Sequence, residues 1–269
     1  MDDIFVHHSP QCLHIEKWER MNPHLRAGFT TRRGGVSTPP FATMNLGLNI
    51  PDDRNDVVEN RQHLAERLSI PLENWVSGEQ IHGNHVCIVN QKDRGKGSHC
   101  YQTSIPGVDG FITNETDILC TAFFADCVPL FFYDSKTHYI GVAHAGWKGT
   151  VSRIAEKMVR TLSSKGVDPA NLFVVIGPAI SQKNYEVDEQ VIDHVDQSLQ
   201  ERTVIQKEND RFLLDLKQLN VEILLQCGVI RSNIEVSNYC TYTDKEMFFS
   251  HRRDAGKTGR MLAFIGYTT

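Results

Sequence analysis

The stretch ILCTAFFADCVPLFFYDSKTHYIGVAHAGWKGT, residues 118 to 150, decides how the rest of the chain is arranged. It holds three apolar runs rich in β-branched and aromatic side chains, which is typical of buried strands. These runs are residues 118–125, 128–133 and 139–143. Gly146 and Gly149 then allow a tight bend into a helix. The pattern predicts three buried strands followed by a helix.

Two side chains with reactive chemistry lie at the ends of these predicted strands. Cys127 falls in the break between the first two strands, and His144 directly follows the third. If the strands pack together, the thiol and the imidazole meet. A thiolate beside an imidazole is the ligand chemistry of zinc or copper, and it is also a nucleophile–base pair. These two residues alone leave both interpretations open.

The remaining chain alternates between strand and helix patterns without a strict βαβ rhythm, and no glycine-rich dinucleotide fingerprint follows a strand. The helices are predicted at residues 56–69, 150–164, 187–198 and 214–227. Further strands are predicted at residues 25–30, 75–77, 86–90, 172–176, 234–241 and 262–267. The pattern predicts an α+β fold.

Charge and cysteine usage limit the partners and the compartment that we expect. The net charge of −5 offers no basic footprint for nucleic acid, although a local arginine cluster could hold one phosphate. The amino terminus lacks the pattern of a secretory signal, and no apolar stretch approaches membrane-spanning length. Seven cysteines without C-x-x-C spacing favour reduced thiols over a disulfide framework. We therefore expect a cytoplasmic protein without a nucleic-acid or membrane partner.

Three motifs taken together point to a known family. They are ADCVPL at residues 125–130, HAGWKGT at 144–150 and QIHG at 80–83. They resemble the signatures of the laccase-domain family, which comprises purine nucleoside phosphorylases long labelled polyphenol oxidoreductases. The likeness covers nearly the whole chain, because other segments match as well: TRRGGVS (31–37), MNLGLN (44–49), GPAI (177–180) and FFSHRRD (248–254). The resemblance implies a single domain over residues 1–269, with mixed β-sheets stacked between layers of helices.

The resemblance also implies that His82 joins Cys127 and His144 as the third ligand of a metal ion. Three protein ligands leave the fourth tetrahedral position for water or substrate, which is the catalytic pattern. Zinc is the first expectation because it accepts mixed nitrogen and sulfur ligands without redox demands, and copper would accept them too. A multicopper oxidase needs many more histidines in H-x-H pairs, and the sequence has none. A copper-dependent polyphenol oxidoreductase is therefore the weaker alternative.

The activity that the resemblance implies is phosphorolysis of adenosine, inosine and methylthioadenosine to free base and pentose 1-phosphate, with deamination of adenosine. The expected partners are thus a purine nucleoside and phosphate. Arg32, Arg61 and Arg252 are the candidate phosphate donors, since a guanidinium suits bidentate binding, and Asn45 is a candidate for hydrogen bonding to substrate. The H-x-E and P-C-x-x-C signature of zinc nucleoside deaminases is absent, so deamination would need a different arrangement. Asp126 adjoins the thiol and would either move protons or cap a turn.

Two alternatives from other functional classes stay open. A Cys-dependent hydrolase would use Cys127 as nucleophile and His144 as base, and an acyl electrophile would label Cys127. A non-enzymatic accessory protein would bind its partner through the polar, glycine-rich loop at residues 91–107. The sequence is equally consistent with a monomer and with a homodimer.

Overall fold

Two six-stranded sheets and one smaller sheet form the framework of the computed structural model, which describes residues 3–269. The strands of the first sheet, in order across it, are β1 (Val6–His7), β2 (Cys12–His14), β3 (Leu25–Thr30), β15 (Met261–Tyr267), β7 (Ile118–Phe124) and β4 (Trp75–Ser77). Those of the second are β14 (Ile234–Val236), β10 (Phe173–Ile176), β8 (Val128–Tyr133), β9 (Ile140–Ala145), β6 (Gly110–Thr113) and β5 (Val86–Ile88). Both sheets mix parallel and antiparallel pairs.

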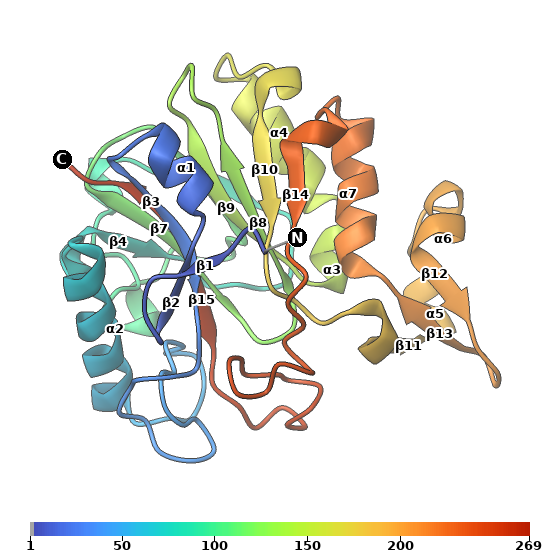
Figure 1. Cartoon of the computed structure of the whole chain (residues 1–269), viewed down its shortest axis with the longest axis horizontal. Helices are drawn as coiled ribbons and strands as arrows, with labels where there is room; N and C mark the ends of the chain where they lie inside the picture. Colours follow the sequence, from blue (N-terminus) through green and yellow to red (C-terminus); the bar gives the residue numbers. More distant parts are fainter. Residues whose placement is uncertain (1–2) are drawn as a thin grey trace.

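Several helices accompany these sheets. They are α1 (Glu16–Met21), α2 (Arg54–Leu68), α3 (Trp147–Val151), α4 (Ile154–Ser163), α5 (Glu189–Ile192), α6 (Gln197–Thr203) and α7 (Leu216–Gln226). Helix α2 packs on the first sheet and helices α4 and α7 on the second, so the sheets lie between helical layers (Figure 1). The third sheet, β11 (Glu186–Asp188), β13 (Arg211–Leu214) and β12 (Val204–Gln206), projects beyond α7 with α5 and α6.

Strand β8 shows why the central strands are apolar along their whole length. Successive side chains of a strand point to opposite faces. Leu130 and Phe132 therefore pack in the core between the second sheet and its helices, whereas Phe131 and Tyr133 pack in the core between the two sheets. Because both faces are covered, the strand reads as a continuous apolar run rather than an alternating one.

The chain crosses from the first sheet to the second between β7 and β8, at Asp126 and Cys127. Strands β8 and β9 pair antiparallel, with Pro129 opposite His144, but β7 belongs to the other sheet and pairs with β15 and β4. Cys127 is therefore placed at a junction between layers and not in a turn within one sheet.

The predicted α+β fold with stacked mixed sheets is confirmed, and one predicted helix is wrong. Residues 187–198 do not form a continuous helix but comprise the end of β11, helix α5 and the start of α6. Asp188 and Asp196 each accept a hydrogen bond from a backbone N–H two or three residues ahead, so each side chain starts a separate helix.

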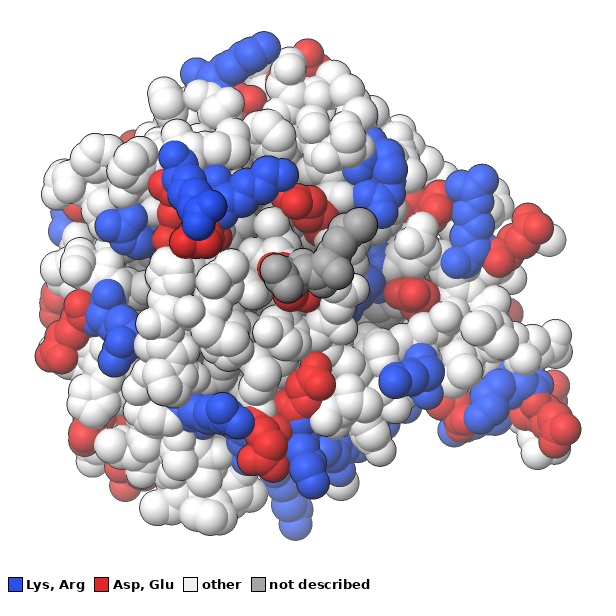
Figure 2. Space-filling model, in the orientation of Figure 1, with Lys and Arg blue, Asp and Glu red and all other residues white. Residues whose placement is uncertain are grey.

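Figure 2 shows acidic and basic side chains interspersed over the face viewed. Within residues 3–269, none of the helices combines the length and the apolar character needed to cross a membrane.

Candidate metal and active site

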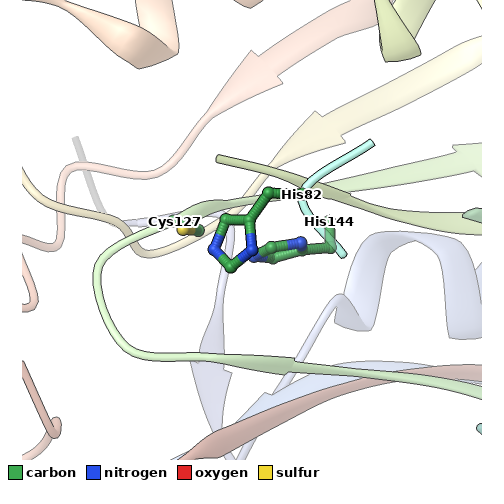
Figure 3. A group of neighbouring side chains, drawn as sticks. All are labelled: His82, Cys127 and His144. Atoms are coloured by element: carbon green, nitrogen blue, oxygen red, sulfur yellow. The ribbon is translucent and has the colours of Figure 1, made fainter. Parts of the chain in front are cut away.

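Three side chains from three separate elements meet at one end of the two sheets. His82 lies in the loop between β4 and β5, Cys127 lies at the crossing between β7 and β8, and His144 lies near the end of β9. One ligand atom from each of the three residues lies within 4.8 Å of the other two, and Figure 3 shows the three side chains side by side. Two imidazole nitrogens and a thiolate sulfur are a donor set that suits zinc or copper. Their role as metal ligands stays a prediction.

The carboxylate of Asp109, immediately before β6, holds two of these three residues in place. Its Oδ1 accepts from Nδ1 of His144 at 2.8 Å and from the backbone N–H of His82 at 3.1 Å. Its Oδ2 accepts from the backbone N–H groups of Ile81 at 3.2 Å and Gly83 at 2.8 Å. With Nδ1 of His144 bonded to the carboxylate, Nε2 is the nitrogen left to bind a ligand. A carboxylate behind a metal-binding imidazole is a common feature of zinc sites.

Gly146 leaves room for the side chains of His82 and Cys127. A Cβ atom at this position would lie 2.8 Å from Cδ2 of His82 and 3.0 Å from Sγ of Cys127. Both distances are shorter than normal van der Waals contacts, so any side chain at residue 146 would displace a ligand. The tight approach explains why glycine follows the end of β9.

The charges and hydrogen bonds around Cys127 and His144 favour a thiolate at Cys127. Burial raises the pKa of the thiol, but the His144 imidazolium and hydrogen bonds from both histidines outweigh burial and lower it from 9.0 to about 6. Burial lowers the pKa of His144, but the Cys127 thiolate and the Asp109 carboxylate together raise it from 6.5 to about 9. The metal-free pair is thus a thiolate beside an imidazolium.

A cavity of about 470 Å³ opens beside the three residues. Its volume falls within the range of roughly 300–1,000 Å³ that is common for small-molecule sites. Aromatic and cationic side chains share its wall, among them Phe123, Trp147, Tyr185, Lys148, Arg252 and Arg260. The side chains of His82, Cys127 and His144 therefore face a cavity that can hold an anionic or aromatic molecule.

Comparison with known proteins assigns the chain to a family. The family described as multi-copper polyphenol oxidoreductase laccase matches residues 26–268. The chain belongs to this family. It is 44% identical over 265 residues to the purine nucleoside phosphorylase YlmD of Bacillus subtilis, covering 96% of this chain and 95% of that protein. It is 46% identical over 244 residues to the protein of the same name from Geobacillus stearothermophilus, covering 89% of each.

Two solved structures show the same fold as this chain. The crystal structure of YlmD from Geobacillus stearothermophilus superposes with a TM-score of 0.95 at 43% identity and covers the whole of both chains. The Bacillus licheniformis hypothetical protein YfiH gives a TM-score of 0.95 at 39% identity, covering 99% of this chain and 100% of that one. The predicted family resemblance is confirmed.

Of the four predicted substrate-binding residues, the structure places Arg252 at the cavity. Its guanidinium lies 5.1 Å above the ring of Tyr185, and its Nη1 donates to the carbonyl oxygen of Glu186 at 2.8 Å. Its Nε and Nη2 have no hydrogen-bond partner within residues 3–269. Arg252 therefore keeps donors that a ligand in the cavity could use.

The other two arginines bind backbone carbonyls outside the cavity lining. Arg61 is fully buried and donates to the carbonyl oxygens of Leu46, Gly97 and Ser98 at 2.6–2.9 Å. Burial lowers its pKa from 12.5 to about 9. Arg32 donates to the carbonyl oxygens at residues 42 and 245. In both residues the guanidinium joins loops together.

Asn45 is also engaged by the protein itself. Its amide group donates to a carboxylate oxygen of Asp52 at 2.8 Å, and its Oδ1 accepts from the backbone N–H of Gly47 at 3.1 Å and of Arg260 at 2.9 Å. The side chain is completely buried. Asn45 thus supports the segment that carries Arg260 and has no face on the cavity.

Arg260 is a cavity-lining residue that was not among the predicted site residues. Its Nη1 donates to the carbonyl oxygens of Thr258 at 2.9 Å and Gly259 at 3.0 Å, whereas Nε and Nη2 have no hydrogen-bond partner within the described chain. Burial lowers its pKa, and the nearby charges of Cys127 and Asp126 act in the opposite direction. It lies in the segment TGR, residues 258–260, directly before β15.

A second group with metal-binding residue types lies near the amino terminus. His8, His14 and Glu19 also have ligand atoms within 4.8 Å of one another. The two imidazole rings stack with centroids 4.3 Å apart and planes 12° apart. An imidazole binds a metal in the plane of its ring, so two stacked rings cannot share one ion in this arrangement. We therefore assign no metal to this group.

Proposed function

We propose that this chain is a metal-dependent purine nucleoside phosphorylase that also deaminates adenosine. The observation that carries the proposal is that one cavity holds the His82, Cys127 and His144 donor set together with two guanidinium groups, those of Arg252 and Arg260. Each guanidinium keeps donors that no atom of residues 3–269 accepts. The names of the Bacillus and Geobacillus relatives support it.

Zinc is the proposed ion, with copper as the second candidate, because the mixed nitrogen and sulfur donors accept both. When bound, the ion would supply a Lewis acid on the wall of the cavity. Asp109 would keep the two imidazoles oriented toward it, and Gly146 would keep the space around the sulfur clear.

The cationic residues of the cavity suit phosphate. In phosphorolysis a phosphate oxygen forms a bond to the anomeric carbon of the nucleoside while the bond to the purine nitrogen breaks. Phosphate must be held as an anion beside the sugar, and forked guanidinium donors are suited to this task. We assign this role to Arg252 and Arg260, with Lys148 as a further charge. Arg32, Asn45 and Arg61 are given no contact with substrate, because their polar groups already bind the protein.

Flat apolar surface for the purine is available on the same wall. Trp147 and Phe123 both line the cavity. The position of Phe123 is secured because Gln80 exchanges two hydrogen bonds with its backbone, at 2.7 and 2.9 Å. A fixed aromatic ring orders a stacked base at low entropic cost.

Product analysis with matched metal measurements tests the proposal. Purified protein is incubated with adenosine or inosine, with and without phosphate, and free base, pentose 1-phosphate and inosine are quantified beside the metal content. We expect adenine and pentose 1-phosphate to appear only with phosphate, inosine to appear from adenosine without it, and both reactions to stop after chelation and return with zinc. Cys127→Ser should lose both metal and turnover, whereas Cys87→Ser, outside the cavity, should keep them.

The same preparations separate the proposal from a Cys-dependent hydrolase. A hydrolase would stay active after chelation and would form a covalent adduct between Cys127 and an acyl electrophile. Nucleoside turnover that is independent of phosphate and metal, or metal-loaded protein without any nucleoside turnover, would overturn the proposal.

A further inference from the structure

Asp126 connects the crossing between the two sheets to the carboxyl-terminal part of the chain. Its Oδ1 accepts from the hydroxyl of Thr241 at 2.6 Å, and its Oδ2 accepts from the hydroxyl of Ser250 at 3.0 Å. Its Oδ2 also accepts from the backbone N–H of Arg252 at 2.7 Å. The side chain is only 7% exposed. The carboxylate is therefore occupied by the protein on both oxygens.

These contacts join two functional groups that lie far apart in sequence. Asp126 immediately precedes Cys127, and the same carboxylate fixes the backbone of Arg252. The guanidinium of Arg252 is fixed independently by the ring of Tyr185 and the carbonyl oxygen of Glu186. The position of the guanidinium relative to the sulfur of Cys127 thus depends on Asp126 at one end and on Tyr185 and Glu186 at the other.

The backbone at Asp126 shows that this residue type suits the position. Its φ is 90°, in the left-handed region that Gly, Asn and Asp enter most readily. A carboxylate facing a phosphate would repel it, but hydroxyl and N–H donors surround this one. The observed contacts favour the turn-holding interpretation of Asp126 over a role in moving protons.

We propose that Asp126 is a positioning residue that holds the guanidinium of Arg252 at a fixed place relative to Cys127, so that phosphate is bound beside the metal ligands. This inference rests on the proposed phosphorylase function. Asp126 lies on the cavity wall, but Thr241, Ser250 and the backbone of Arg252 occupy its carboxylate, so we assign it no contact with phosphate or nucleoside. Its removal should weaken phosphate binding more than nucleoside binding or metal binding.

Two substitutions of Asp126 distinguish the effect of its hydrogen bonds from the effects of its charge and of its backbone conformation. In Asp126→Asn the amide oxygen can accept from Ser250 and Arg252, while the amide N–H₂ donates to the hydroxyl of Thr241, which can act as acceptor. In Asp126→Gly the backbone keeps its φ, but all three hydrogen bonds are lost. Asp117→Gly is the matched control, because Asp117 also has a positive φ of 55°, and its side chain has no hydrogen-bond partner within residues 3–269.

The measured quantities are KM for phosphate, KM for nucleoside, kcat and metal content. For Asp126→Gly we expect KM for phosphate to rise about tenfold or more, as expected for loss of one well-placed charge-assisted contact. KM for nucleoside and the metal content should change by less than about threefold, in line with a separate binding site. Asp126→Asn and Asp117→Gly should resemble the parent. If Asp126→Gly does not fold, Ser250→Ala and Thr241→Val remove the partners singly and should each raise KM for phosphate.

Three results would overturn the inference: an unchanged KM for phosphate in all the folded variants that remove these bonds, loss of metal in Asp126→Gly at unchanged KM for phosphate, or loss of kcat in Asp126→Asn. Calorimetry measures the binding of inorganic phosphate to the metal-loaded proteins. This measurement distinguishes failure of the inference about Asp126 from failure of the proposed function. If the parent binds phosphate without phosphorolysis, the function fails while the ratio of parent to Asp126→Gly affinity still tests the inference.

Discussion

Nδ1 of His144 lies 2.8 Å from Oδ1 of Asp109, and the same carboxylate accepts three backbone N–H groups of the loop that carries His82. One side chain thereby fixes the tautomer of one imidazole and the path of the chain at the other. All four of its partners are donors, which makes the carboxylate difficult to replace.

Asp109→Asn should weaken metal binding although the side chains have the same shape. Whichever way the amide is turned, its N–H₂ group faces two donors and leaves them without an acceptor. We expect the zinc affinity to fall by about 10–100-fold, the usual effect of removing a residue that orients a metal ligand. Competition with a chelator of known affinity measures the change, and Asp117→Asn serves as control. An unchanged affinity would show that the carboxylate does not orient the ligands.

Arg260→Lys should raise KM for phosphate, because a lysine keeps the charge but loses the forked donors. Arg260→Gln should raise it further, by about tenfold or more relative to the parent. The zinc content should stay at the level of the parent, since Arg260 is not in the predicted ligand set. Steady-state kinetics at saturating nucleoside gives KM for phosphate directly. Equal values for parent and both variants would exclude Arg260 from the phosphate site.

In the metal-free protein, Cys127 should remain a thiolate to lower pH than an ordinary thiol. Its pKa lies near 6 instead of 9.0, so the rate of alkylation by iodoacetamide should fall as the pH drops through about 6. Mass spectrometry of the peptide that contains Cys127 follows this single thiol. His144→Gln removes the imidazolium while burial still raises the pKa, so the midpoint should move upward. A midpoint that stays near 6 in this variant would contradict the assigned cause.

The two pKa shifts of the pair oppose each other in their effect on stability. Cys127 has a folded pKa below the unfolded value of 9.0, so its contribution is complete above 9.0 and is lost as the pH falls through about 6. His144 has a folded pKa above 6.5, so its contribution is complete below 6.5 and is lost as the pH rises through about 9. Between these limits one contribution grows as the other declines. The pair should therefore add little pH dependence to the unfolding free energy of the metal-free protein.

Arg61→Met should destabilise the fold, and it also removes the guanidinium that lies 4.7 Å from the ring centroid of Phe123 on the cavity wall. The methionine fills part of the space but leaves the carbonyl oxygens of Leu46, Gly97 and Ser98 without their donor. We expect the free energy of unfolding to fall by about 3 kcal/mol, as for loss of several buried hydrogen bonds to a charge. Urea denaturation measures it. Arg67→Met, on the exposed face of the same helix, should change stability by less than about 0.5 kcal/mol.

The proximity of Cys127 and His144 could be predicted because each lies at the end of an apolar run, and buried runs pack together. The placement of β7 and β8 in different sheets could not, because strands covered on both faces have the same apolar pattern in either sheet. His82 lies in a polar loop without a periodic pattern, so its place beside the pair came from the family likeness alone.

The arginines show a second limit of the sequence. Arg61 and Arg252 carry the same functional group, and only the tertiary structure distinguishes them. Arg61 donates to backbone carbonyl oxygens, whereas Arg252 has further donors that face the cavity. The error at residues 187–198 has a local cause. The apolar spacing suits a helix, but Asp188 and Asp196 cap new turns and divide it.

Two of the four crossings between the two large sheets pass the same point: the loop from β4 to β5 carries His82, and the step from β7 to β8 carries Cys127. Adding or deleting even one residue in either connection would pull a donor atom out of reach of the others. These two short segments should therefore tolerate no change of length. Insertions and deletions among related chains should gather in connections such as the hairpin from β12 to β13, which lies on the projecting third sheet.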